Sequence, residues 1–194
     1  MAAEVSLDIQ SAEIIAKIGG ITERMRNLKD ALIDAGEEII TSVQENFEAE
    51  GRYSVVGSYI GGNTKWQELS PITKEIRKRT GRGENKILHL SGRLRDSITR
   101  SEPTNDSITV GTNLSYAKMH QFGAKKGEYG TVTQYIKEHK RKSKSGNVHT
   151  VKGHQRNVKN PAFTVPERPF LTVHPENLER INRNFSDYLL ADLK

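Results

Sequence analysis

The strongest pattern in the sequence is an apolar stripe in the first quarter of the chain. From Ile21 onward, apolar residues recur at intervals of three and four positions, at Met25, Leu28, Leu32, Ala35, Ile39, Val43 and Phe47. This spacing places them on one face of an α-helix, and most acidic residues of the N-terminal third fall on its outer face. We therefore predict a single helix of about seven turns that ends at Gly51.

Weaker patterns precede this helix. Alternation with polar residues predicts a short half-buried strand at Val5, Leu7 and Ile9. Ser11 is suited to cap a brief helix that runs through Ile18. We expect the pair Gly19-Gly20 to separate this brief helix from the long one.

The middle of the chain contains several short elements. The stretch 51–65 is rich in glycine and has no hydrophobic period, which predicts a flexible loop. Ser70-Pro71 starts a short basic helix, because the serine oxygen accepts hydrogen bonds from free N–H groups and proline suits the first turn. This helix stops at Gly81, and a second helix start lies at Ser91-Gly92.

Three further elements complete the core of the chain. Alternating residues on both sides of the turn cluster 103–106 predict a hairpin over 98–111. Residues 114–122 are expected to be at least partly helical. Pro175 opens a last helix, and its buried stripe is expected to comprise Leu178, Ile181, Phe185 and Leu189.

Residues 125–160 form the most unusual segment. Polar, strand-like runs at 131–142 and 147–158 flank the turn cluster 143–147, which predicts one long β-hairpin arm. Its large apolar residues are too few for a core of its own, so the arm must lie against the domain or project onto a partner. The alternative is a segment that folds only on binding, because low hydropathy and a net charge of +8 also describe disordered chains. We favour an arm that is ordered in the assembled state.

Together these elements predict an α+β fold in a single domain that covers residues 1–194. The long N-terminal helix and the C-terminal helix pack on a small antiparallel sheet, and the long β-hairpin arm protrudes from it. The length of 194 residues is ample for one buried core. Because only 6% of the residues are aromatic, we expect that core to be aliphatic.

Composition excludes several classes of protein. The chain has no cysteine, which excludes a disulfide scaffold, a thiolate zinc site and a cysteine nucleophile. No apolar run approaches the roughly 20 residues that cross a bilayer, so we expect no membrane contact. Residues 1–10 contain no basic residue, so we expect no secretory signal.

Charge is distributed unevenly along the chain. Residues 1–64 carry a formal charge of −6, residues 65–100 carry +6 and residues 125–160 carry +8. The basic side chains of the arm either contact DNA phosphates or clasp the acidic helix of a neighbouring copy. These residues are Lys137, Lys140, Arg141, Lys142, Lys144, Lys152, Arg156 and Lys159. Aromatic residues for base stacking are nearly absent, which disfavours sequence-specific recognition, and we favour the clasp because one contact then accounts for both charge extremes.

Patterns for catalysis and metal binding are missing. The stretch 57–65 lacks the Gly-Lys-Ser/Thr ending of a phosphate loop, and Glu37-Glu38 is expected on the solvated face of the long helix. His139, His149 and His154 share the arm, but the surrounding lysines would repel a cation. We therefore expect no metal, no cofactor and no enzymatic activity; a hydrolase would rest on nothing beyond the presence of serine and histidine.

Several short motifs follow one another along the chain, and their order is more informative than any one of them. The first two are Trp66-Gln67-Glu68-Leu69-Ser70-Pro71-Ile72-Thr73 and Ile87-Leu88-His89-Leu90-Ser91-Gly92-Arg93-Leu94-Arg95-Asp96-Ser97-Ile98. The next are Val110-Gly111-Thr112-Asn113 with Tyr116-Ala117, then His120-Gln121-Phe122-Gly123, then Arg168-Pro169-Phe170-Leu171. In this order, over roughly residues 1–190, the sequence resembles the phage virion morphogenesis family, the Mu-like and P2-like tail completion proteins.

The resemblance implies a virion protein without catalytic activity, assembled in the host bacterial cytoplasm. It implies a ring of copies, often six, at the head–tail junction, with the tail tube or head-neck proteins as partners. The fold implied is that of small α+β tail terminator and connector proteins. The loop 51–65 and the arm depart from a minimal member and would sit on or near an interface. The alternative function is a basic nucleic-acid-binding module that contacts DNA phosphates through the arm.

The motif residues are expected to be mainly structural. Trp66 covers one end of the long helix, and Gly92 and Gly111 permit tight turns. Where the arm leaves the domain, we expect packing of Tyr116, His120 and Phe122, with Gly123 as the hinge. Pro169 and Phe170 anchor the returning chain. The functional alternative is that Gln121 and Arg168 also bond across a subunit boundary.

Overall fold

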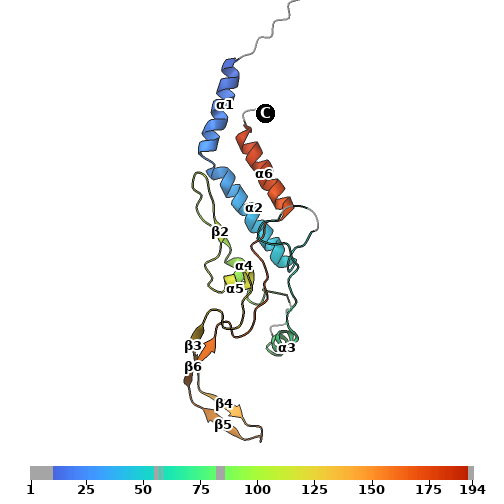
Figure 1. The fold of residues 1–194 in the computed structure, drawn as a ribbon, viewed down its shortest axis with the longest axis vertical. Helices are drawn as coiled ribbons and strands as arrows, with labels where there is room; N and C mark the ends of the chain where they lie inside the picture. The colour runs from blue at the N-terminus through green and yellow to red at the C-terminus, as the bar shows by residue number, and fades with distance from the viewer. Residues whose placement is uncertain (1–10, 55–56, 58, 82–85, 192–194) are drawn as a thin grey trace, which may run out of the picture.

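The computed structural model describes residues 11–54, 57, 59–81 and 86–191. The described chain is elongated, with α1 near one end and β4 and β5 at the other (Figure 1). Its helices are α1 Ser11–Arg26, α2 Lys29–Glu48, α3 Pro71–Arg79, α4 Arg93–Asp96, α5 Ala117–Gln121 and α6 Pro175–Leu189. Its strands are β1 Thr99–Arg100, β2 Val110–Gly111, β3 Thr131–Ile136, β4 His139–Lys142, β5 Val148–Val151 and β6 His154–Lys159. This mixture of helices and small antiparallel sheets agrees with the predicted α+β class.

The prediction of one long helix is wrong, because α1 and α2 are separate helices. In a continuous helix the N–H of Leu28 would donate to Arg24, but it donates instead to the carbonyl of Asn105 at 3.0 Å. The hydroxyl of Tyr188 donates to the carbonyl of Asn27 at 2.6 Å. The turn 103–106 and α6 thus hold the chain at the point where the helix is interrupted.

The break predicted at Gly19-Gly20 is also wrong, since α1 runs through both glycines. A glycine inside a helix costs only about 1 kcal/mol relative to alanine, which the remaining turns of α1 can absorb. The strand predicted near Val5 lies outside the described residues.

The core surrounds the C-terminal half of α2. Phe47 is fully buried, and its ring centroid lies 5.5 Å from that of Trp66, edge to face, and 5.5 Å from that of Phe170. Leu94 and Ile98, which follow the helix start predicted at Ser91-Gly92, join this cluster. Three aromatic rings thus meet at the centre of the core, and the other buried hydrophobic residues are aliphatic, as composition predicted.

The two longest helices pack on each other. The sequence predicted both on a sheet, but α6 lies along α2, and α2 contacts the β1–β2 pair (Figure 1). The predicted hairpin is present with the register Thr99↔Gly111 and Arg100↔Val110, but each strand has only two residues. A pair this short cannot form a layer on which two helices pack.

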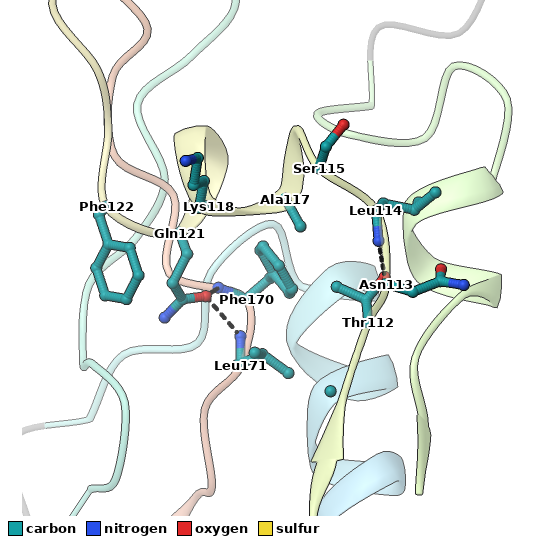
Figure 2. Close-up of a pocket in the computed structure, with 11 residues that line it drawn as sticks. Thr112, Asn113, Leu114, Ser115, Ala117, Lys118, Gln121, Phe122, Phe170 and Leu171 are labelled. Atoms are coloured by element: carbon teal, nitrogen blue, oxygen red, sulfur yellow. Dashed lines mark hydrogen bonds between the residues drawn. The ribbon is translucent and has the colours of Figure 1, made fainter. Parts of the chain in front are cut away.

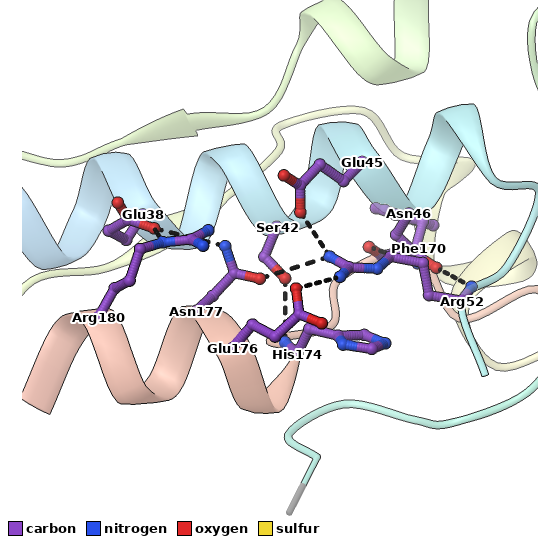
Figure 3. Close-up of polar contacts among 10 residues, drawn as sticks. All are labelled: Glu38, Ser42, Glu45, Asn46, Arg52, Phe170, His174, Glu176, Asn177 and Arg180. Atoms are coloured by element: carbon purple, nitrogen blue, oxygen red, sulfur yellow. Dashed lines mark hydrogen bonds and ion pairs between the residues drawn. The ribbon is translucent and has the colours of Figure 1, made fainter. Parts of the chain in front are cut away.

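Polar side chains fasten α6 to α2 (Figure 3). Arg180 donates to the carboxylate of Glu38 at 2.9 Å. The backbone N–H of His174, the N-cap of α6, donates to the hydroxyl of Ser42 at 3.0 Å. Asn177 is fully buried in this seam, whereas the predicted apolar stripe of α6 is only half-buried. The prediction of a solvated face for Glu38 is wrong, because the sequence does not reveal that Arg180 faces it.

The segment 168–174 returns the chain to α2 in an extended, irregular conformation. Asn46 donates through Nδ2 to the carbonyls of Pro169 at 2.9 Å and Phe170 at 3.2 Å. Its Oδ1 accepts the backbone N–H of Arg52 at 2.7 Å. Asn46 is 1% exposed, so one side chain satisfies three backbone groups where water has little access.

The loop 51–65 is fastened in its described part. Ile60 and Val173 exchange backbone hydrogen bonds of 3.2 and 2.8 Å. The side-chain amide of Asn63 bonds both the N–H and the carbonyl of Ser54. Gly61 has φ 90°, and a Cβ at this position would collide with the carbonyl oxygen of Leu171, so only glycine permits this close approach.

We predict that Asn46→Ala lowers the free energy of unfolding by about 2–4 kcal/mol, because it leaves buried backbone groups without partners. Urea denaturation of the folded chain measures this change. Asn113→Ala is the matched control, since Asn113 is exposed and its loss is expected to cost less than about 0.5 kcal/mol. Equal losses in the two variants would contradict the role assigned to Asn46.

Candidate assembly surfaces

Gln121 joins three distant parts of the chain beside the core (Figure 2). Its Oε1 accepts the backbone N–H groups of Phe170 and Leu171, both at 3.0 Å, and its Nε2 donates to the carbonyl of Gly61 at 3.4 Å. Gln121 is 9% exposed. Its polar atoms thus serve the fold of a single chain, as expected for a structural motif residue, and the alternative of a further bond across a subunit boundary stays a prediction.

Arg168 is used in the same way. Its backbone N–H donates to the carbonyl of His120 at 2.6 Å, and its guanidinium donates to the carbonyl of Gln67 through Nε at 3.2 Å and Nη2 at 2.9 Å. Burial lowers the pKa of Arg168, and neighbouring Arg77 lowers it further. The guanidinium therefore ties the returning segment to the chain before α3 and is not presented at the surface.

Trp66 lies where the sequence placed it, at the end of α2 against Phe47. Its indole Nε1–H donates to the carbonyl of Pro169 at 2.9 Å. Ser70 caps α3 as predicted, accepting the N–H of Thr73 at 3.2 Å with Pro71 in the first turn. These motif residues hold the fold together.

The motif glycines divide into two groups. Gly92 has φ 68° and Gly123 has φ 70°, a left-handed conformation that favours glycine. The tight turn predicted at Gly92 is present, and the hinge at Gly123 stays a prediction. Gly111 lies in β2 and is not among the described glycines with positive φ. The turn predicted at Gly111 is therefore wrong, because the chain passes through it as a strand.

The predicted packing where the 125–160 segment leaves the domain is correct for two aromatic residues and wrong for a third. The rings of Tyr116 and His120 meet edge to face with centroids 6.1 Å apart. Phe122, however, is 75% exposed, and Phe163 is 78% exposed. These residues flank the bridge Ala124↔Val165, so two phenyl rings are presented to solvent near the point where the segment departs.

A hollow of about 460 Å³ lies beside Phe122 (Figure 2). Leu114, Phe170 and Leu171 give it an apolar lining, and Lys118 is its one charged lining residue. The amine of Lys118 also lies 4.2 Å from the ring centroid of Tyr129. The hollow and the exposed phenyl ring form one candidate docking surface.

Residues 131–159 form two antiparallel ladders, and we call this segment the ribbon. The inner ladder pairs β3 with β6, from Thr131↔Lys159 to Ile136↔His154, and the outer ladder pairs β4 with β5. The register of the inner ladder places Val132, Ile136 and Val158 on one face. Val132 is exposed, and Tyr135 on the other face is 63% exposed.

A bend separates the two ladders on both strands. The Nδ1 of His139 lies 3.0 Å from the carbonyl oxygen of Lys137, and the Nδ1 of His154 lies 3.0 Å from that of Lys152. On each strand, the histidine ring thus contacts the carbonyl oxygen of the residue two positions earlier. The tip of the ribbon, residues 137–152, is thereby set apart from the inner ladder.

The acidic residues of α2 are largely used within the chain. Four of its carboxylates make ion pairs with basic side chains from other parts of the same molecule. The pairs are Glu37–Arg100, Glu38–Arg180, Glu45–Arg52 and Glu48 with Lys86 and Arg95. Among the described residues, by contrast, no ion pair involves a cation of the ribbon.

His174, which is buried, and His120, which is partly buried, both have lowered pKa values. Burial lowers the pKa of His174, and the nearby guanidinium of Arg52 lowers it further. Neither ring nitrogen has a hydrogen-bond partner among the described residues, and the ring packs edge to face on Tyr59. Burial also lowers the pKa of His120, with an added contribution from Arg168.

Sequence reasoning missed the polar residues that do most to fix this region, Asn46, Ser42 and Asn177. Asn46 and Ser42 adjoin the apolar positions Val43 and Phe47 along α2. This placement beside the apolar stripe is the sequence feature that could have indicated their burial.

Over the described ranges, no three histidine or acidic side chains come together as a metal site, and no helix is long and apolar enough to span a membrane.

Comparison with known proteins gives one match. The family model described as the phage virion morphogenesis family matches residues 9–190 of the chain. No curated protein and no solved structure matches. The match spans the motifs, the loop 51–65 and the ribbon in one continuous range.

We predict that the chain loses stability as the pH falls below about 6.5, the ordinary pKa of histidine in an unfolded chain. The lowered pKa values of His120 and His174 make the unfolded state bind more protons in this range. Their contribution is complete above about pH 6.5 and is lost as the pH falls toward the lower pKa values of the folded state. Glu48 and Glu68, whose pKa values are lowered by Lys86 and Lys74, add a further loss in more acidic solution.

Urea denaturation between pH 7.5 and 5 measures this loss. The variant His174→Phe keeps the ring contact with Tyr59 and removes one titrating group, so its stability is expected to fall less steeply with pH. His149→Phe is the control, because His149 is exposed on the ribbon. An unchanged pH profile for His174→Phe would contradict the assignment.

Proposed function

The chain belongs to the phage virion morphogenesis family, and we propose that it is a non-enzymatic structural protein that forms a ring at the phage head–tail junction. In this role it completes or terminates the tail and joins it to the head. Family membership gives a structural or assembly role in the phage virion; the ring and its position are the proposal.

The observation that carries the proposal is the apolar surface left uncovered on the inner ladder. A two-stranded ladder is marginally stable in water unless a further strand or helix covers it. Val132, Ile136 and Val158 are apolar side chains on one face of this ladder, which they share with Gln134, Arg156 and His154, and Val132 is exposed. A protein surface outside the single chain is therefore needed to bury this face, and a neighbouring copy supplies it.

The opposite end of the molecule carries a second uncovered apolar face. Ile14, Ile18 and Met25 on α1 are spaced by four and seven residues and are each about half exposed or more. Exposed apolar patches of this kind mark sites of protein association. Because α1 and the inner ladder lie toward opposite ends (Figure 1), a contact between them joins copies head to tail. Head-to-tail contacts form a ring when the rotation between copies closes, and we propose that it does so here.

This contact differs from the charge clasp favoured by the sequence. The clasp requires free carboxylates on α2, but four of them are engaged within the chain. Burial of apolar side chains is thus the better-supported basis for the ring. The hollow beside Phe122 is left for a different partner, which we propose to be the tail tube or a head-neck protein.

We predict that the triple variant Val132→Thr, Ile136→Thr and Val158→Thr weakens ring formation by about 100-fold or more, because it places hydroxyl groups in an interface that buries methyl groups. The ladder keeps β-branched residues, so the monomer is expected to stay folded. Light scattering of the purified chain measures assembly, and electron microscopy with isolated tails shows whether a ring forms on the tail end.

The control is a triple variant on the other face of the same ladder, Thr131→Ser, Thr133→Ser and Gln155→Ser, which is expected to assemble normally. The proposal fails if the Val132 triple variant assembles like the unmodified chain. It also fails if the unmodified chain stays monomeric at high concentration and binds neither tails nor heads.

A further inference from the structure

The tip of the ribbon has a chemistry that the ring contact does not use. It contains six basic residues and one acidic residue, a formal charge of +5 within residues 137–152. The six cations are all exposed: Lys137, Lys140, Arg141, Lys142, Lys144 and Lys152. The side chains of the inner ladder, by comparison, include two cations, Arg156 and Lys159.

These cations repel one another, and none of them forms an ion pair with a carboxylate of the described residues. Lys140, Arg141 and Lys142 are consecutive, and Lys144 follows after one residue. A cluster of like charges held on a projecting element is expected to bind a polyanion.

A second copy of the chain is a poor source of that negative charge. Its most acidic element is α2, where only Asp30 and Asp34 lack an internal ion pair among the six acidic residues. Two carboxylates cannot balance a charge of +5. The complement must therefore be a partner with a higher density of negative charge.

We propose that the tip binds the phosphates of double-stranded DNA without reading its sequence. Duplex DNA carries one phosphate charge for about every 1.7 Å of its axis, a density that a short cluster of six cations can engage at several points. Lysine and arginine bind phosphates as charge-assisted donors and need no base contacts. Aromatic side chains for stacking on bases are absent from the tip.

The register of the outer ladder supports contacts along more than one side. Lys140 and Lys142 share one face, and Arg141, paired with His149, lies on the other. Cations on both faces can therefore donate to phosphates on either side of the ribbon.

The bends at His139 and His154 keep this surface separate from the ring contact. The apolar face of the inner ladder ends at Ile136, and the cationic tip begins after it. A neighbouring copy can cover the inner ladder while the tip remains available to DNA. The DNA contact does not require the ring, so each proposal can fail without the other.

The test is DNA affinity as a function of salt, measured by fluorescence anisotropy with a labelled 30-base-pair duplex of arbitrary sequence. Six phosphate contacts predict a slope of about −5 for log Kobs against log[NaCl]. Affinity is then expected to fall about 1,000-fold between 50 and 200 mM NaCl. A duplex of different sequence is expected to bind equally well.

The variant K140Q/R141Q/K142Q/K144Q is expected to bind at least about 100-fold more weakly at 50 mM NaCl, with the slope reduced to about −2. The matched control is K78Q/R79Q/K125Q/K126Q, which removes the same charges from exposed positions outside the tip. The control is expected to keep a slope within one unit of the unmodified chain.

Three results would overturn the proposal. One is no DNA binding by the unmodified chain at 50 mM NaCl, and another is an equal loss in the two variants, which would reflect overall charge. The third is that the tip variant loses self-association and keeps DNA affinity, which would identify a second copy as the partner.

A second measurement on the unmodified chain avoids any effect of the substitutions on folding. Acetylation of lysines, followed by mass spectrometry, is expected to show protection of Lys140, Lys142 and Lys144 when DNA is present. Lys78 and Lys126 are expected to react equally with and without DNA. Equal reactivity at the tip in both conditions would contradict the proposal.

Discussion

The fold depends on how the buried backbone of the returning segment 168–174 finds its hydrogen bonds. An extended chain inside a protein usually pairs with a neighbouring strand. Here side chains take the place of that strand: Gln121 accepts two N–H groups, and Asn46 donates to two carbonyls. Once these groups are satisfied, Phe170 can be buried against Phe47 and Trp66. The core, the loop 51–65 and the start of α6 are all held by this one arrangement.

This arrangement shows what the sequence could and could not predict. Local rules sufficed where one residue decides the outcome, as at the Ser70 cap of α3 and the left-handed turn at Gly92. The order of the motifs also identified the family. The interruption after Arg26 could not be predicted, because it is caused by Asn105 and Tyr188, which are far away in the sequence. The pairing of Glu38 with Arg180 was hidden for the same reason.

The charge distribution illustrates the same limit. Segment sums suggested an acidic helix and a basic arm that attract each other between copies. In the folded chain, basic residues from 52 to 180 pair with four of the six carboxylates of α2. The cations of the ribbon make no ion pair with any residue that the structure describes. A sum along the sequence therefore overstates the free charge of a region whenever the fold brings opposite charges to it. Only the charge that stays unpaired in the fold can attract a partner.

The unpaired positive charge of the tip would affect the closure of a ring of such chains. Each copy adds a tip of charge +5, and copies in a ring hold their tips at fixed distances from one another. At physiological salt, charges within about 8 Å repel with little screening, so closely spaced tips oppose closure. The apolar contact of the inner ladder must outweigh this repulsion, or a polyanion must remove it. A ring that closes around DNA would be stabilised both by the apolar contact and by the neutralisation of its tips. A ring without DNA would be stabilised by the apolar contact alone. This difference would favour assembly where DNA is present.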